Sequence, residues 1–230
     1  DVGRVLITSS LAAVGRCADG IATESTPLQP ISMYGRSKAE MEQALRAKHE
    51  MRASYADQLP ITIVRPPAVY GPRDRDILTF FQAVKRHVCP VVGRGDAPAI
   101  SLVYVRDLVR GMVDAAEDET TVGETYFIGS EAAYSWNDVK AAATSALDTW
   151  ALTVPVPGAL VGAVGAAAEA WGALTGSYPP LNREKAREIR HACTICSVDK
   201  AQSDFGYAQH VELDKGVQET IDWYTDEGWL

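Results

Sequence analysis

The chain has 230 residues, of which 47% are hydrophobic and 23% are charged, and this ordinary globular composition excludes a disordered, collagen-like or coiled-coil protein. Its 30 acidic and 22 basic residues give a formal net charge of -8, so we expect no nucleic-acid partner, because such partners are bound through basic surfaces. The longest apolar stretch, residues 159–174, contains Glu169 and is shorter than the roughly 18 to 20 apolar residues of a membrane span. It predicts a buried helix and no membrane span.

The first elements in chain order predict a right-handed unit of strand, helix and strand. Residues Arg4–Thr8, RVLIT, form a short β-branched run that is typical of a buried parallel strand. A helix from about Met33 to Arg52 follows, with Ser32 as a suitable N-cap and strong helix formers throughout. Residues Ile61–Val64, ITIV, predict the second buried strand, which two prolines end.

The alternation of helices and strands continues more loosely along the chain. It predicts a helix near Ile77–Arg86, a strand near Ile100–Val105, a helix at Arg106–Glu117, a strand at Thr125–Ile128, and a helix that begins at Ser135 and ends near Leu147. The segment Val154-Pro155-Val156-Pro157 marks the start of a mostly helical C-terminal third, apart from a short stretch at Thr194–Val198. This order predicts an α/β fold with a doubly wound, mainly parallel sheet.

Four cysteines, Cys17, Cys89, Cys193 and Cys196, are too few and too scattered for a disulfide framework. Cys193 and Cys196 form a single C-x-x-C, whereas a structural zinc site needs four ligands, and we expect no metal. Because no signal peptide opens the chain, we expect a cytoplasmic protein.

Tyr34 and Lys38 lie four residues apart near the start of the predicted helix and therefore share one helical face. A positive charge beside a phenol favours the phenolate, so such a pair can move a proton to or from a carbinol oxygen. On an arbitrary helix the same spacing is more often a solvated surface pair.

Two further groups of residues follow the predicted strands. Thr8, Ser9 and Ser10 supply hydroxyl groups at the end of the first strand, although serines there are also common turn formers. Residues 65–72, RPPAVYGP, form a rigid loop after the second strand. Ligands of open α/β sheets bind at the carboxyl ends of the strands, so these groups and the tyrosine–lysine pair together predict one site.

These motifs resemble the extended short-chain dehydrogenases/reductases of the NAD-dependent epimerase/dehydratase type. The similarity rests on four segments: RVLITSSLAAVG, YGRSK, RPPAVYGPRD and LVYVRDLVRGMVDAAE. SSLAAVG followed by YGRSKAEME most resembles the 3-beta-hydroxysteroid dehydrogenase group. The resemblance implies a partial Rossmann-type sheet at residues 1–153, with residues 70–100 partly in the cap, and a mostly helical substrate-binding region at residues 154–230.

The resemblance also implies roles for individual residues. Tyr34 would be the general acid/base, and Lys38 would hold the nicotinamide ribose. Ser10, five residues before Gly15, would bond the substrate oxygen. Ser9 would support this site, and backbone groups around Pro67 and Val69 would lie near the nicotinamide. The implied cofactor is NAD or NADP, and the implied partners are a small-molecule substrate and, as a candidate, a second copy of the chain.

The sequence departs from the family's pattern at its front, where the first three strands and the glycine-rich loop that receives the pyrophosphate are absent. We therefore expect a fragment of a longer protein or a truncated product. Two function classes stay open. One is an oxidoreductase or epimerase that uses a nicotinamide dinucleotide, and the other is a non-catalytic remnant that cannot bind it.

The stretch Ala97–Val105 contains no basic residue, whereas the family's sugar-nucleotide members place an arginine there to hold a diphosphate. Residues 160–174 are instead rich in Ala, Gly, Val and Trp, which suits an apolar pocket. We therefore expect a lipophilic, sterol-like or smaller alcohol or ketone as substrate rather than a nucleotide sugar. Arg94 or Arg183 could still supply the missing charge.

Overall fold

The computed structural model describes residues 2–47, 55, 59–92, 98–156, 187–188 and 191–230. The strands are β1 Val5–Thr8, β2 Ile21–Ala22, β3 Ile61–Arg65, β4 Ala68–Tyr70, β5 Val88–Val92, β6 Pro98–Ile100, β7 Leu102–Tyr104, β8 Thr125–Phe127, β9 Tyr134–Ser135, β10 Leu152–Val156 and β11 Ile195–Cys196. The α-helices are α1 Met33–Arg46, α3 Asp76–Lys85, α4 Val105–Glu117, α5 Trp136–Ala146, α8 Asp199–Phe205 and α9 Leu213–Asp226, and the 3-10 helices are η1 Leu11–Ala13 and η2 Glu119–Thr121. Our expectations for residues 159–174, Arg94 and Arg183 lie outside the described residues.

A three-stranded parallel sheet in the order β1-β3-β8 forms the centre of the fold. Leu6 pairs with Thr62, and Ile63 pairs with Thr125, so all three strands end at the same edge. β3 is buried along its whole length, as its β-branched sequence predicts. Among the other described strand pairs, β2–β11, β4–β7 and β5–β10 are parallel and β6–β9 is antiparallel. The predicted α/β fold with a mainly parallel sheet is confirmed.

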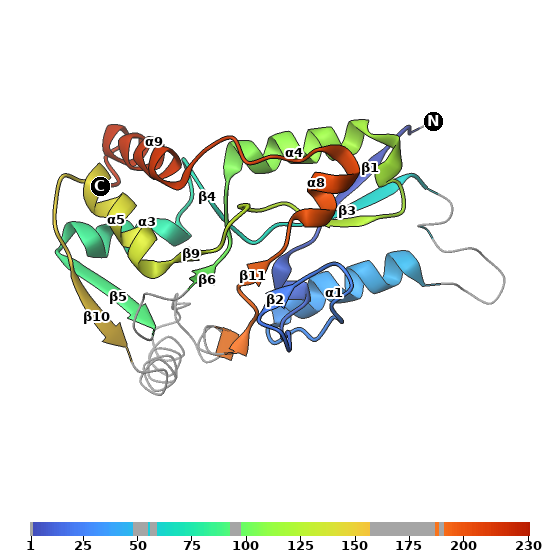
Figure 1. Ribbon diagram of the computed structural model, residues 1–230, viewed down its shortest axis with the longest axis horizontal. Helices are drawn as coiled ribbons and strands as arrows, with labels where there is room; N and C mark the ends of the chain where they lie inside the picture. Colours follow the sequence, from blue (N-terminus) through green and yellow to red (C-terminus); the bar gives the residue numbers. More distant parts are fainter. Residues whose placement is uncertain (1, 48–54, 56–58, 93–97, 157–186, 189–190) are drawn as a thin grey trace, which may run out of the picture.

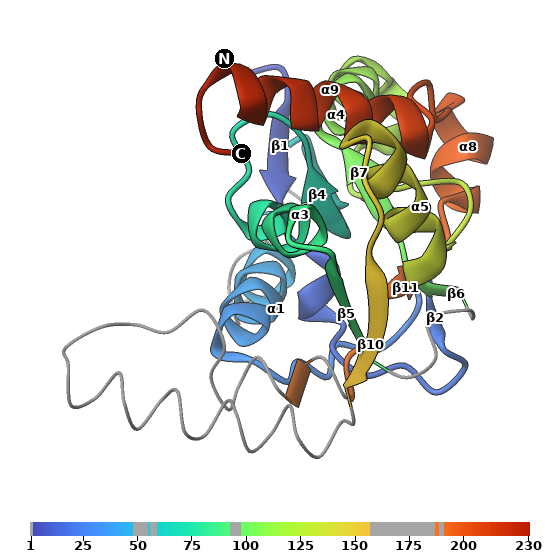
Figure 2. The ribbon, with the colours of Figure 1, turned by 90° about the vertical axis from the view of Figure 1, so that its left-hand side faces the viewer.

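Helices cover both faces of this sheet. Figure 1 shows α4 along one side of β1 and β3 and α1 along the other, and the turned view agrees (Figure 2). On the α4 side, Leu108 packs in a buried cluster with Val64, Tyr126 and Ile128. The strands are therefore held between two helical layers, with their carboxyl ends free to carry a site.

A second buried cluster joins α3, α5 and α9 with β4, β5 and β7. Its members include Phe81, Val84, Val139, Val217 and Tyr224, each at most 1% exposed. The three helices lie at the opposite end of the molecule from α1 in Figure 1. The cluster packs three helices against β4, β5 and β7, and no residue of β1 is among its described members.

The segment that we took as the start of a mostly helical part is a strand in its described residues. β10 pairs in parallel with β5, and Val154 lies opposite Pro90. Proline is tolerated here because both strands of a two-stranded sheet are edge strands. The pairing joins segments that are far apart in the sequence, which local patterns do not indicate. The boundary at residue 153 stays a prediction.

Two other predicted elements differ from the structure. The strand expected at residues 100–105 is divided between β6 and β7, because the chain changes strand partner at Ser101, whose amide donates to the carbonyl oxygen of Thr194. Val105 is already the first residue of α4. The helix expected to reach Arg52 ends at Arg46, and Ala47 is extended.

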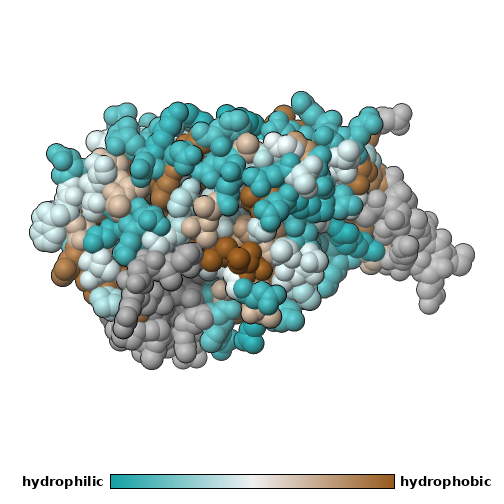
Figure 3. Space-filling view, in the orientation of Figure 1, coloured by the Kyte–Doolittle hydropathy of each residue, from teal (hydrophilic) through white to brown (hydrophobic). Residues whose placement is uncertain are grey.

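None of the helices in the described part of the chain is long and apolar enough to cross a membrane. In the orientation of Figure 1 the surface over α4 is mostly hydrophilic, and hydrophobic surface gathers in the middle of the same face (Figure 3).

Candidate functional site

The first turn of α1 is fixed against the end of β1 by a cap and a close contact. Ser32 is the N-cap, and its Oγ accepts a hydrogen bond of 3.0 Å from the amide of Gly35. Gly35 lies against the backbone of Ala12, where any side chain at position 35 would overlap the carbonyl oxygen. The helix start that carries Tyr34 therefore lies directly on η1, the short helix that Ser10 caps.

Tyr34 and Lys38 lie on one face of α1, as their spacing predicts. The Nζ atom of Lys38 donates a hydrogen bond of 2.9 Å to the carbonyl oxygen of Thr8, at the end of β1. The same Nζ atom lies 5.8 Å from the centroid of the Tyr34 ring. Tyr34 is 55% exposed, so its phenol is open to a ligand at the strand ends.

The Ser10 hydroxyl lies where β1 passes into η1. Its Oγ accepts a hydrogen bond of 3.1 Å from the amide of Ala12, and this bond leaves the hydroxyl hydrogen free to be donated. The amide of the next residue, Leu11, donates to the carbonyl oxygen of Pro66 at 2.9 Å. This bond joins the end of β1 to the loop after β3.

Ser9 points in the opposite direction, into the protein, and is 1% exposed. Its Oγ donates a hydrogen bond of 2.5 Å to Oε1 of Glu42. Arg65 donates to the same carboxylate, from Nε to Oε1 at 2.9 Å and from Nη2 to Oε2 at 2.6 Å. Sequence reasoning missed this buried ion pair. The available signal was that Glu42 lies four residues after Lys38, on the helical face that Tyr34 and Lys38 occupy.

Pro67 and Val69 lie in the segment that follows β3. Pro67 is buried and packs against Gly129, beyond the end of β8. Val69 is 37% exposed in β4 and pairs with Val103 of β7. The structure thus brings Ser10, Tyr34, Lys38 and Pro67 to neighbouring strand ends through direct bonds between their segments.

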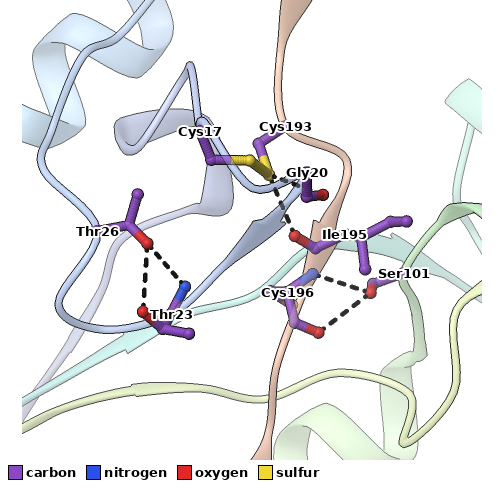
Figure 4. Close-up of a disulfide and its surroundings, with 8 residues drawn as sticks. All are labelled: Cys17, Gly20, Thr23, Thr26, Ser101, Cys193, Ile195 and Cys196. Carbon is purple, nitrogen blue, oxygen red and sulfur yellow. Dashed lines mark hydrogen bonds between the residues drawn. A yellow bond between two sulfur atoms is a disulfide. The ribbon is translucent and has the colours of Figure 1, made fainter.

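Although we expected no disulfide framework, Cys17 and Cys193 form one disulfide (Figure 4). They are 176 residues apart in sequence, and β11 brings them together because it pairs with β2.

Cys196 and Cys89 are free and buried. Burial raises the pKa of the Cys196 thiol to about 12, and Ser101 accepts from the Cys196 amide at 3.1 Å. Of the two cysteines of the C-x-x-C, Cys193 is therefore in a disulfide, and Cys196 is a buried, unreactive thiol.

Within the described residues, no group of three or more His, Cys, Asp or Glu side chains lies close enough together to hold a metal ion.

Comparison with known proteins gives the same family for more than half of the chain. Residues 1–129 match the family described as the NAD dependent epimerase/dehydratase family. The chain is 32% identical to the uncharacterized protein y4nL of Sinorhizobium fredii over 99% of its own length and 64% of that protein. It is 29% identical to the ceramide reductase of Caulobacter vibrioides over 87% of its own length and 59% of that protein.

A solved structure shares the fold. The chain is similar to UDP-glucuronic acid 4-epimerase from Bacillus cereus, solved with UDP-glucuronic acid and NAD, with a TM-score of 0.69 at 20% identity over 99% of this chain and 63% of that one. The chain thus spans about three fifths of the length of each of these relatives. The matched residues include the strand ends, Tyr34 and Lys38, and the chain belongs to the NAD-dependent epimerase/dehydratase family.

Proposed function

We propose that the protein containing this chain is an NAD-dependent oxidoreductase that interconverts an alcohol and a ketone on a small lipophilic substrate. The observation that carries this proposal is the meeting of Tyr34, Lys38 and Ser10 around the end of β1, where Lys38 bonds the carbonyl oxygen of Thr8. An exposed phenol, an ammonium and a free hydroxyl hydrogen at one point are suited to proton transfer at a carbinol oxygen.

In the proposed reaction the Tyr34 phenol gives a proton to the substrate oxygen during reduction and takes it during oxidation. Ser10 donates its hydroxyl hydrogen to the same oxygen and so fixes its position. The Lys38 ammonium stabilises negative charge that develops on the phenol oxygen, and it binds hydroxyl groups of the cofactor ribose. Ser9 has a supporting role from inside the protein, and the backbone around Pro67 and Val69 bounds the site on the β3 side.

The residues of this chain fit the nicotinamide end of a dinucleotide. When bound, the nicotinamide supplies hydride transfer at its C4 position. Lys38 and Tyr34 are presented at the carboxyl ends of parallel strands, which is where such ligands bind. The glycine-rich loop that would hold the pyrophosphate is not among these 230 residues, so cofactor binding is proposed for the protein that contains this chain.

The lipophilic substrate class rests on the strands beside the site. β6 and β7 together contain no arginine or lysine that could hold a diphosphate. A relative at 29% identity is named a ceramide reductase, which is consistent with a lipid-like substrate.

One observation favours a nucleotide sugar as the second candidate. Arg16, Arg36 and Arg187 line a shallow hollow of about 630 Å³, and no acidic residue is among its described lining residues. Arginine clusters of this kind bind phosphate groups. We rank this candidate second because Arg36 lies about 200° around α1 from Tyr34, at about 100° per residue, so it projects from another side of the helix.

The test is an assay of the complete protein with NAD and a panel of hydroxysteroids, ceramide-like ketones, small aromatic carbinols and nucleotide sugars. We expect reduced nicotinamide to form or disappear with lipophilic members of the panel. Selective turnover of the sugars would replace the first candidate by the second. Failure to bind NAD in a titration of the folded protein would contradict both and would favour a non-catalytic protein.

A further inference from the structure

A buried charged network joins the three segments that carry the proposed site. Glu42 of α1 is 1% exposed, and the side chain of Arg65, at the end of β3, is 6% exposed. The Glu42 carboxylate accepts from Ser9 at 2.5 Å and from Arg65 at 2.9 and 2.6 Å. A single carboxylate thus connects helix α1 with the ends of β1 and β3.

Stability alone does not account for a buried network of this kind. Removing two charges from water costs free energy, and apolar side chains of similar size in their place often leave stability unchanged or improve it. What apolar side chains cannot reproduce is direction, because a two-pronged guanidinium–carboxylate contact fixes both the distance and the orientation of its partners.

The network lies next to the groups whose positions the chemistry requires. Glu42 follows Tyr34 by two helical turns and Lys38 by one, on the same face of α1. Ser9 directly precedes Ser10. Arg65 directly precedes Pro66, whose carbonyl oxygen accepts from the Leu11 amide at 2.9 Å. A shift of the Glu42 carboxylate would therefore be transmitted to both sides of the proposed site.

Other contacts hold α1 on either side of Glu42. In the first two turns, Gly35 packs on Ala12, and Lys38 bonds the carbonyl oxygen of Thr8. In the last turn, Nη2 of Arg46 donates a hydrogen bond of 2.6 Å to Oγ1 of Thr125 in β8. Glu42, in the third turn, is the residue whose side chain bonds both the end of β1 and β3.

We propose that Glu42 is a positioning residue which, through Ser9 and Arg65, sets the placement of Tyr34 and Lys38 relative to Ser10 and the loop after β3. It does not contact the substrate itself. This inference rests on the proposed function for its effect on catalysis, and it has a structural readout that does not require catalysis.

The main test is the double variant Glu42→Met/Arg65→Met in the complete protein. Methionine fills the space of each side chain and leaves no unpaired buried charge, so we expect the protein to fold. We expect kcat to fall by about 10- to 100-fold, because displacement of reacting groups by about 1 Å can have an effect of that size. KM should change much less. Ser9→Ala removes one bond of the network and should lower kcat by a smaller factor.

Glu42→Gln and Thr62→Val serve as matched controls. Glutamine keeps an oxygen that accepts from Ser9 and Arg65, so its kcat should lie between those of the wild type and the double variant. Thr62 is buried in the same strand as Arg65 and bonds the carbonyl oxygen of Thr121 at 2.9 Å, away from the site. Thr62→Val should change the midpoint of unfolding and leave kcat per folded molecule unchanged.

The second readout is native-state hydrogen exchange of the Ser9 and Leu11 amides, which bond the carbonyl oxygens of Val64 and Pro66. In the double variant both amides should exchange faster, while that of Ile63, in the middle of β3, should not. Wild-type kcat in a folded double variant, or unchanged exchange of both amides, would overturn the proposal. If the wild type turns over no substrate but the two amides still respond, the proposed function has failed and the positioning network has not.

Discussion

The two ends of the molecule are held together by different kinds of contact. Around β1, β3 and α1, buried polar side chains bond one another directly, as Ser9, Glu42 and Arg65 do. Around α3, α5 and α9, aromatic rings pack on one another, and Tyr224 stacks on Trp229 with ring centroids 5.7 Å apart. Directional bonds fix positions at a modest gain in stability, whereas apolar packing supplies stability with weaker demands on orientation. The difference accords with the proposal that the first end carries the reaction, while apolar packing holds the second end together.

The largest expected effect on stability lies at the aromatic end. Tyr224 is fully buried, contacts Phe81 and Trp229, and donates its hydroxyl to the carbonyl oxygen of Asp74. Tyr224→Ala should lower the free energy of unfolding by about 3 to 5 kcal/mol. Urea denaturation would measure this loss. If the two ends differ as described, kcat per folded molecule of Tyr224→Ala should stay unchanged. A parallel loss of kcat would contradict the difference between the polar end and the aromatic end.

The disulfide should have an intermediate effect. It joins the loop after η1 to the segment before β11, so it ties the site-bearing end to the C-terminal part of the chain. Replacing Cys17 and Cys193 by serine should cost about 2 to 4 kcal/mol. Equilibrium denaturation of the variant, and of the wild type with and without a reductant, would measure this loss in the free energy of unfolding.

A thiol count provides the control for this prediction. The unfolded, unreduced wild type should show two reactive thiols, from Cys89 and Cys196, and four after reduction. Four thiols without reduction would show that the bond does not form in the isolated protein.

The smallest effect concerns pH at the polar end. Burial raises the pKa of Glu24 above its ordinary value of 4.5, although its hydrogen bond from the Phe127 amide acts in the opposite direction. Because the folded protein holds this proton more firmly than the unfolded chain, the contribution of Glu24 to stability is greatest below pH 4.5 and is lost as pH rises through the raised folded value. Glu24→Gln cannot ionise, so it should be slightly more stable than the wild type at pH 7.

The size of that gain is about 0.5 kcal/mol or less, as for other partly exposed positions. Thermal denaturation of both proteins at pH 4 and pH 7 would test it. A difference in stability that grows as pH falls would contradict the assignment.

Local patterns predicted the parts of the fold that depend on neighbours in sequence. The β-branched run of β3, the Ser32 cap and the spacing of Tyr34 and Lys38 each express a local rule. The pairing of β10 with β5 and the Cys17–Cys193 bond join distant segments, and no local rule anticipates them. Glu42 is an intermediate case, which we did not predict. The helical period puts it on the face of Tyr34 and Lys38, but its pairing with Arg65 depends on the tertiary fold.

The central claim is that the Tyr34 phenol carries the proton of the reaction. Its hydroxyl makes no hydrogen bond within the described residues, so Tyr34→Phe should leave the fold and NAD affinity intact. The matched control is Tyr55→Phe, since Tyr55 is 54% exposed and Tyr34 is 55% exposed. The decisive measurement is the turnover number of both variants in the complete protein with a substrate accepted by the wild type. The account predicts a fall of about 100-fold or more for Tyr34→Phe and no change for Tyr55→Phe. Equal turnover in the two variants would contradict it.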